Sequence, residues 1–207
     1  MSTAEAPSPL PGARAKGNAA VKTALVDAAG EMLAEVGPKR LSVRDVAERA
    51  GVNHGQVHHY FGGKRGLLEA AMHALAKQHF DESLERAGGA AVPAPLALIE
   101  HRTYFRAISQ CVLDGDIDLV MTVDRDDEVS VPLRVLHHLR EANPQSDDLD
   151  LRAGFAVAAA MQLGWVAFEE LLLVLAEVEP GEEAEFQNRV KTAMSRMFEF
   201  GTQLTDA

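Results

Sequence analysis

The sequence predicts an all-α protein built from an N-terminal three-helix domain of the helix-turn-helix type and a larger C-terminal helical domain. Apolar residues recur three and four positions apart in most segments, and no segment shows the alternation typical of a strand. The stretch 41–64 is typical of two short helices joined by a tight turn. With 207 residues, the chain is long enough to bury a substantial core.

The stretch 41–64 carries its own signals for where helices begin and end. Ser42 is a favoured N-cap, and Asp45 three residues later completes a pattern similar to a capping box. Gly51 follows the last turn of the first helix, where a left-handed residue is needed. Asn53 is then placed to cap the second helix. These signals predict a helix, a turn and a second helix.

The second helix of this stretch is predicted to expose a polar face. Val57 and Phe61, four residues apart, are expected to face the first helix. The other side chains suit DNA recognition, because glutamine pairs with adenine, while histidine, tyrosine and lysine reach phosphates or base edges. This exposed set is His54, Gln56, His58 and Tyr60, followed by Lys64. A helical hairpin with a hydrated polar face is the alternative interpretation.

These residues resemble the N-terminal DNA-binding domain of TetR-type transcriptional repressors. The matching residues are Leu41-Ser42-Val43-Arg44-Asp45-Val46-Ala47, Ala50-Gly51-Val52, Tyr60-Phe61, and Lys64 before Leu67-Leu68. The motifs cover about residues 21–68. His58 departs from the tyrosine usual in the family, and Gly63 from a polar helix cap. The resemblance implies that DNA is contacted by Val43, Arg44, His54, Gly55, Gln56, His58, Tyr60 and Lys64.

Helical periodicity and breaking residues predict the remaining elements. Besides the pair already described, the expected helices cover residues 18–36, 64–87, 95–113, 131–142, 149–178 and 182–204, with a short one before residue 124. Residues 1–17 are rich in Pro, Ala and Gly without periodicity, which predicts a disordered arm. The predicted domains are therefore 18–68 for DNA binding, continuing into a linking helix, and 69–207 for effector binding and dimerisation.

Charge is distributed unevenly along the chain. The net charge is −11, but it is +2 through Leu75 and −13 beyond it. Attraction to phosphate is therefore expected only in the first domain. The single cysteine, Cys111, cannot form an internal disulfide and fits a reducing cytoplasm. The longest uncharged run, residues 153–168, is short for a membrane span and fits a buried helix, so we expect a cytoplasmic protein without a membrane partner.

The predicted helices 95–113 and 149–178 carry aromatic and Met residues mixed with polar groups. This composition suits a pocket for a small hydrophobic or amphipathic effector. The expected ligand contacts are Arg102, Phe105, Met161, Gln162, Trp165, Phe168 and Glu169. Met161, Trp165 and Phe168 are spaced to share one helix face, with Gln162 and Glu169 on a neighbouring stripe. Packing of the aromatic residues in an ordinary core is the alternative.

The last two predicted helices carry more apolar surface than one small domain needs. This excess predicts an oligomer interface, and the resemblance implies that these helices form a four-helix bundle between the two subunits of a homodimer. Two recognition helices would then read the half-sites of a near-palindromic operator in double-stranded DNA. The alternative is the core of an ordinary monomer.

No catalytic or cofactor-binding motif is found, so we expect neither an enzyme nor a cofactor. Residues 114–118 resemble the start of a calcium loop, but Leu119 and Arg125 replace the required Gly and Glu. His137 and His138 are adjacent and project about 100° apart, so they do not chelate one metal. A ligand-independent regulator and, less favoured, a helical-bundle enzyme remain as alternatives to an effector-released repressor.

Overall fold

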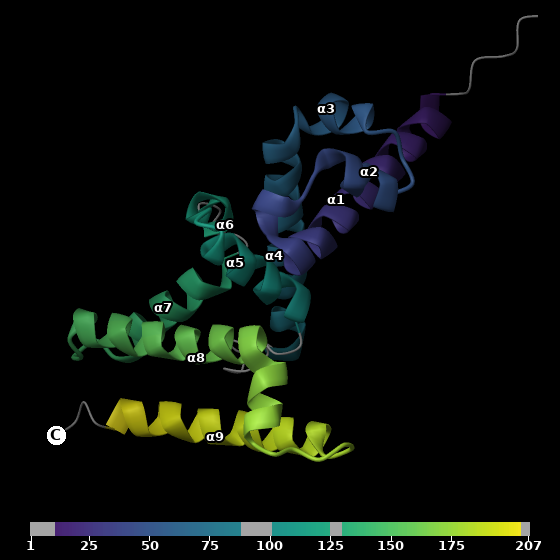
Figure 1. Ribbon diagram of the computed structural model, residues 1–207. Coiled ribbons are helices and arrows are strands. Elements are labelled where there is room, and N and C mark those ends of the chain that lie inside the picture. Colours follow the sequence, from purple (N-terminus) through teal and green to yellow (C-terminus); the bar gives the residue numbers. More distant parts are fainter. Residues whose placement is uncertain (1–10, 88–100, 125–129, 204–207) are drawn as a thin grey trace, which may run out of the picture.

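All regular elements in the described part of the chain are helices (Figure 1). The computed structural model describes residues 11–87, 101–124 and 130–203. In chain order the helices are α1 (Pro11–Arg40), α2 (Val43–Arg49), α3 (Gly55–Phe61), α4 (Lys64–Ala87), α5 (Arg102–Leu113), α6 (Ile117–Asp124), α7 (Val131–Ala142), α8 (Asp148–Leu175) and α9 (Glu183–Gln203). The prediction of an all-α fold is confirmed, and the bounds of α4 and α7 are those predicted.

Helix α1 is longer than predicted at its N-terminus. It begins at Pro11 rather than near residue 18, so the irregular conformation predicted for residues 11–17 is wrong. Proline is favoured in the first turn of a helix, and the alanines that follow are strong helix formers. The rest of the predicted arm, residues 1–10, lies outside the described residues. Near the other end, Gly37 adopts φ 77° and interrupts α1 where the sequence places its end.

Two predictions about the C-terminal helices need correction. Helix α5 begins at Arg102, because His101 has a non-helical backbone (φ −108°, ψ 49°), and residues 88–100 are outside the described part. Helix α8 is interrupted at Phe168, whose φ and ψ are −119° and 15°. The bend directs the last turns of α8 toward α9 (Figure 1).

One hydrophobic cluster joins the helix-turn-helix helices to the following ones. Its members come from α1 to α6 and α8, and include Leu25, Leu33, Val46, Val57, Leu67, Met72, Phe105, Cys111, Leu119 and Val166. Helix α5 packs along α1, and α6 packs on α4. The position of the recognition helix is therefore coupled to the C-terminal helices through packed side chains. The division into domains 18–68 and 69–207 stays a prediction.

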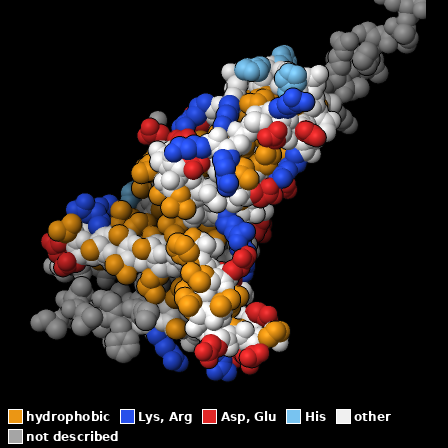
Figure 2. Space-filling model, viewed as in Figure 1, with side chains coloured by type: hydrophobic (Ala, Val, Ile, Leu, Met, Phe, Trp, Pro, Cys, Tyr) orange, Lys and Arg blue, Asp and Glu red, His pale blue; other side chains and the backbone are white. Residues whose placement is uncertain are grey.

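Helix α8 is largely exposed in the single chain, although its apolar composition predicts a buried helix. Its buried residues are Gln162, Trp165, Val166 and Glu169. Large apolar side chains elsewhere on α8 are solvent-exposed, among them Val157, Phe168, Leu171, Val174 and Leu175. By length and composition alone α8 is apolar enough to cross a membrane. Orange side chains follow this helix in Figure 2.

Candidate functional site

The first helix of the predicted DNA-binding pair begins as its sequence indicates. The Ser42 hydroxyl accepts a hydrogen bond from the backbone N–H of Asp45 at 3.2 Å, and its backbone is extended. Gly51 has φ 67°, so the left-handed turn expected after α2 is confirmed. The backbone N–H of Val52 then donates to the carbonyl of Ala47 at 2.9 Å and closes the turn.

Helix α3 buries one residue and leaves its polar face open. The N-cap of α3 is His54 rather than the predicted Asn53, but the Asn53 side-chain oxygen accepts a hydrogen bond from the backbone N–H of Gly55, the first residue of α3, at 2.8 Å. Val57 is fully buried against the core. His54 and His58 are exposed and Gln56 is half-buried. Histidine side chains form the tip of the molecule over this end in Figure 2. The geometry leaves the predicted reading face accessible to a large partner.

Tyr60 and Lys64 lie at the end of this pair of helices. The Tyr60 hydroxyl donates to the side-chain oxygen of Asn18 at 2.9 Å, and the ammonium of Lys22 lies 5.4 Å from the centre of its ring. These contacts fix Tyr60 against α1. Lys64 is the first residue of α4, where unpaired backbone N–H groups favour an anion. The structure places Lys64 beside α3, as the predicted phosphate contact requires.

The remaining predicted DNA contacts on α2 differ in exposure. Arg44 is exposed, and Val43 is half-buried against the core. Arg49 on the same helix donates to both carboxylate oxygens of Glu35, at 2.9 and 2.7 Å. The hydrogen bonds from Arg49 lower the pKa of Glu35. Arg49 therefore links α2 to α1. No such ion pair is found for Arg44 in the part of the chain that the structure describes.

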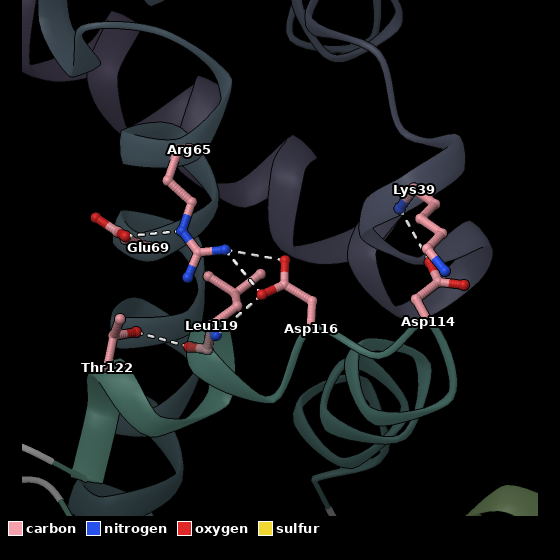
Figure 3. Close-up of polar contacts among 7 residues, drawn as sticks. All are labelled: Lys39, Arg65, Glu69, Asp114, Asp116, Leu119 and Thr122. Carbon is pink, nitrogen blue, oxygen red and sulfur yellow. Dashed lines mark hydrogen bonds and ion pairs between the residues drawn. The ribbon is translucent and has the colours of Figure 1, made fainter.

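The turn between α5 and α6 contacts the end of α1. The Asp114 carboxylate accepts a hydrogen bond from the backbone N–H of Lys39 at 2.9 Å (Figure 3). Gly37 has φ 77°, which disfavours any other residue, and a Cβ there would also lie 2.8 Å from the same carboxylate oxygen. The acidic run that superficially resembles a calcium loop thus fixes the C-terminal helices to α1.

Asp116 of the same turn contacts the first turn of α4. Its carboxylate accepts two hydrogen bonds from one Arg65 nitrogen, at 2.8 and 2.9 Å, and Arg65 also pairs with Glu69 (Figure 3). These hydrogen bonds, with Asp116 the larger contributor, raise the pKa of Arg65. Asp116 also accepts from the backbone N–H of Leu119 and so caps α6. Arg65 follows Lys64 in the first turn of α4, so this ion pair connects the turn after α5 to the N-terminus of α4.

The cysteine beneath this turn is unsuited to redox chemistry. Cys111 is fully buried. Burial, with a smaller contribution from the carboxylates of Asp116 and Asp114, raises the pKa of its thiol to about 11. The thiol therefore stays protonated and unreactive at neutral pH.

We expect Asp116→Ala to lower the free energy of unfolding by about 1–2 kcal/mol, because α6 loses its cap and Arg65 loses its partner. Urea unfolding followed by circular dichroism measures the change. Asp118→Ala is the matched control, since Asp118 is exposed in the first turn of the same helix, and its effect should stay within about 0.5 kcal/mol. Equal losses in both variants would contradict the role given to Asp116.

A polar cluster joins α5, α8 and α9. Glu169 is 6% exposed and pairs with both terminal nitrogens of Arg102. It also accepts a hydrogen bond from the side-chain amide of Gln187 at 2.7 Å. The predicted ligand contacts Arg102 and Glu169 are thus brought together. Sequence analysis missed Gln187, because no local pattern indicates which residue of α9 lies opposite Glu169.

The aromatic residues expected in one pocket are not all in one place. Trp165 packs with Met161 of α8 and with Phe186 of α9, whose ring centre is 6.3 Å away. Phe105 lies instead in the main core. Phe168 lies at the interruption in α8 and is 56% exposed. Phe168 is therefore outside the Trp165 cluster, and its ligand contact stays a prediction.

A groove of about 180 Å³ lies between α1 and α5. It is lined by Glu31, Ala34, Glu35, Arg102, Thr103 and Arg106. Four of these six residues are charged, so the groove differs from the pocket of aromatic and Met residues that the sequence predicts. Within the described ranges, no three His, Cys, Asp or Glu side chains form a group that would hold a metal ion.

Comparisons with known proteins agree with this geometry. The family described as "Bacterial regulatory proteins, tetR family" matches residues 25–71. HTH-type transcriptional repressor Rv3405c of Mycobacterium tuberculosis is 29% identical over 184 residues, covering 88% of this chain and 92% of that protein. A TetR-family regulator from Streptomyces coelicolor has a similar fold, with TM-score 0.53 and 19% identity over 89% of this chain and 81% of its own.

The fold is also shared by a variant of TetR from Acinetobacter baumannii, whose crystal structure was solved in complex with minocycline. The TM-score is 0.51 at 17% identity, over 90% of this chain and 95% of that one. The family match covers the helix-turn-helix, and the mycobacterial relative aligns along most of both chains. Residues 25–71 therefore match the DNA-binding domain of the TetR family, and the chain as a whole is similar to TetR-family transcriptional regulators.

Proposed function

We propose that this chain is a cytoplasmic, homodimeric repressor that binds a near-palindromic operator and is released from it by a small hydrophobic or amphipathic molecule. The observation that carries the proposal is the open polar face of α3, presented at one end of the molecule (Figure 2). The repressor activity given to the mycobacterial relative supports the direction of regulation. We assign no catalytic role to the chain.

The residues of the reading face have different roles in this proposal. His54 is the N-cap of α3 and Gln56 lies in its first turn, the part of a recognition helix that contacts base edges. Arg44 and Lys64 contact phosphates on either side, and Tyr60 is fixed by Asn18 for the same purpose. Val43, Gly55 and His58 are the remaining residues of the proposed surface that contacts DNA. Phosphate contacts then set affinity, while Gln56 sets sequence preference.

Two substitutions separate these roles. Gln56→Ala is expected to cost about 1–3 kcal/mol on the preferred site and to relax base preference there. Lys64→Ala is expected to weaken binding to all sequences and to reduce the slope of log affinity against log salt by about one. Fluorescence anisotropy on an operator selected from a random DNA pool, and on a scrambled duplex, measures both effects.

Glu48→Ala is the control for these variants, because Glu48 is exposed on α2 and belongs to no predicted contact. It should preserve discrimination between operator and scrambled duplex. Wild-type discrimination in Gln56→Ala, or equal loss of discrimination in Gln56→Ala and Lys64→Ala, would refute the roles assigned here.

The exposed apolar face of α8 supports dimerisation through α8 and α9. Exposed large apolar side chains occur on both sides of the interruption in α8, Val157 before it and Leu171 and Leu175 after it, and the small residues Ala160 and Gly164 lie between them in sequence. Contiguous apolar surface of this kind on a regulator marks a protein interface. A second copy of α8 and α9 covers it in a two-fold symmetric bundle. In this proposal the same face meets a partner subunit rather than a bilayer.

Effector release follows if a ligand favours a dimer whose recognition helices do not match the operator spacing. A ligand shifts such an equilibrium only through its different affinity for the two states. The complex of the Acinetobacter protein with minocycline supports ligand binding in this fold. A ligand-independent repressor is the second candidate, and it predicts operator affinity that no small molecule changes.

A further inference from the structure

Helix α8 buries two polar atoms that lack hydrogen-bond partners within the described part of the chain. Gln162 and Trp165 are each 7% exposed. The side-chain amide nitrogen of Gln162 donates to the carbonyl of Ala158 on its own helix at 3.4 Å, but its oxygen has no partner among the described residues. The indole N–H of Trp165 has none there either. One atom is an acceptor and the other a donor, and buried groups of this kind are normally satisfied by protein, water or ligand.

The two atoms belong to one stripe of α8. Gln162, Trp165, Val166 and Glu169 are the buried residues of this helix, and their spacing of three, one and three places them on one face. That face lies between α5, which Glu169 contacts through Arg102, and α9, which it contacts through Gln187.

Apolar side chains surround the free indole N–H. Trp165 and Met194 form a separate cluster with Met161, Leu172, Phe186 and Val190. An apolar body that enters between α8 and α9 beside Trp165 would contact these side chains, while the two free atoms specify a polar group.

The charges near this stripe are already paired. Arg102 contacts Glu169, and Arg106 of α5 lies 3.7 Å from the carboxylate of Glu170. An acidic ligand would have to compete with these carboxylates for a cation. A neutral group meets no such competition.

We propose that the effector lies against this stripe and is an uncharged molecule with an apolar body and a hydroxyl or primary amide. This group accepts a hydrogen bond from the Trp165 indole N–H and donates one to the Gln162 carbonyl oxygen. A hydroxyl suits either role, because it is both donor and acceptor. The inference rests on the proposed release by a small molecule and adds the ligand class and its polar anchors.

Three probes of similar shape test the ligand class. These are 4-tert-butylphenol, which donates and accepts, 4-tert-butylanisole, which only accepts, and 4-tert-butylbenzoate, which is an anion at pH 7.5. Calorimetry on the full-length chain should show the phenol binding at least tenfold more tightly than the other two. Equal binding of phenol and anisole, tighter binding of the benzoate, or no binding of any probe at millimolar concentration would overturn the proposal.

Two variants test the anchors. Gln162→Leu and Trp165→Phe should each remove the preference for the phenol, whereas Gln145→Leu, on an exposed glutamine, should keep it. Without ligand, Gln162→Leu should raise the melting temperature by about 2–4 °C, because it removes an unsatisfied buried oxygen. A lowered melting temperature would show that this oxygen already has a partner in the assembled protein, and would overturn the inference.

Operator binding distinguishes failure of the site from failure of the function. If the phenol releases operator DNA equally well from the wild type and from Gln162→Leu, the effector binds elsewhere and only this inference is lost. If the phenol binds with the expected preference but leaves DNA affinity unchanged, the ligand site on α8 is supported and the proposal of release by an effector is refuted.

Discussion

Gly66→Ala is expected to abolish specific operator binding and to lower the free energy of unfolding by about 2–3 kcal/mol. Gly66 lies in the first turn of α4, and a Cβ built there collides with the backbone carbonyl oxygen of Phe61 at the end of α3. A backbone atom cannot rotate away as a side chain does, so α3 must move relative to α4. A displaced recognition helix no longer fits the DNA major groove at the position that the rest of the proposed dimer sets.

Urea unfolding and anisotropy on the selected operator measure the two effects. Gly17→Ala is the matched control, because Gly17 is an exposed residue of α1 with no atom near a built Cβ. Alanine there should leave stability unchanged or raise it slightly, since it favours the helix. Wild-type stability and affinity in Gly66→Ala would show that the turn between α3 and α4 is adaptable.

The parts of the structure that the sequence predicts well depend on near neighbours. Ser42 caps α2 through a residue three positions away, and Gly51 supplies the left-handed conformation directly after that helix. The bounds of α4 and α7 follow from residues at their own ends in the same way. Family resemblance also placed the DNA-contact set in this region, and its members lie at one end of the molecule, although their individual contacts stay predictions.

The parts that sequence analysis missed depend on distant residues or on tertiary packing. Asp116 pairs with Arg65 at a separation of 51 residues, and Arg102 pairs with Glu169 at a separation of 67. The sequence of the acidic run containing Asp116 is enough to compare it with the calcium-loop pattern. The sequence does not predict the contacts of this run with α1 and α4. The interruption of α8 at Phe168 has no proline or glycine at that residue to indicate it.

Leu171→Glu is expected to convert the dimer into folded monomers and to lower operator affinity at least a hundredfold. Leu171 is 54% exposed in the single chain, so a glutamate there remains hydrated and does not disturb the monomer. In a symmetric bundle through α8 it enters the interface from both subunits, and each unpaired buried carboxylate costs several kcal/mol. A monomer contacts only one half-site, which removes the affinity gained by binding both.

Sedimentation velocity at micromolar concentration, circular dichroism and operator titration distinguish dissociation from unfolding. Leu113→Glu is the matched control, because Leu113 is a 77% exposed leucine at the end of α5 and does not belong to the exposed apolar face of α8. It should remain a dimer with wild-type affinity. Wild-type sedimentation of Leu171→Glu would place the dimer interface on another surface, and a monomeric wild type that still binds the whole operator tightly would refute the two-half-site arrangement.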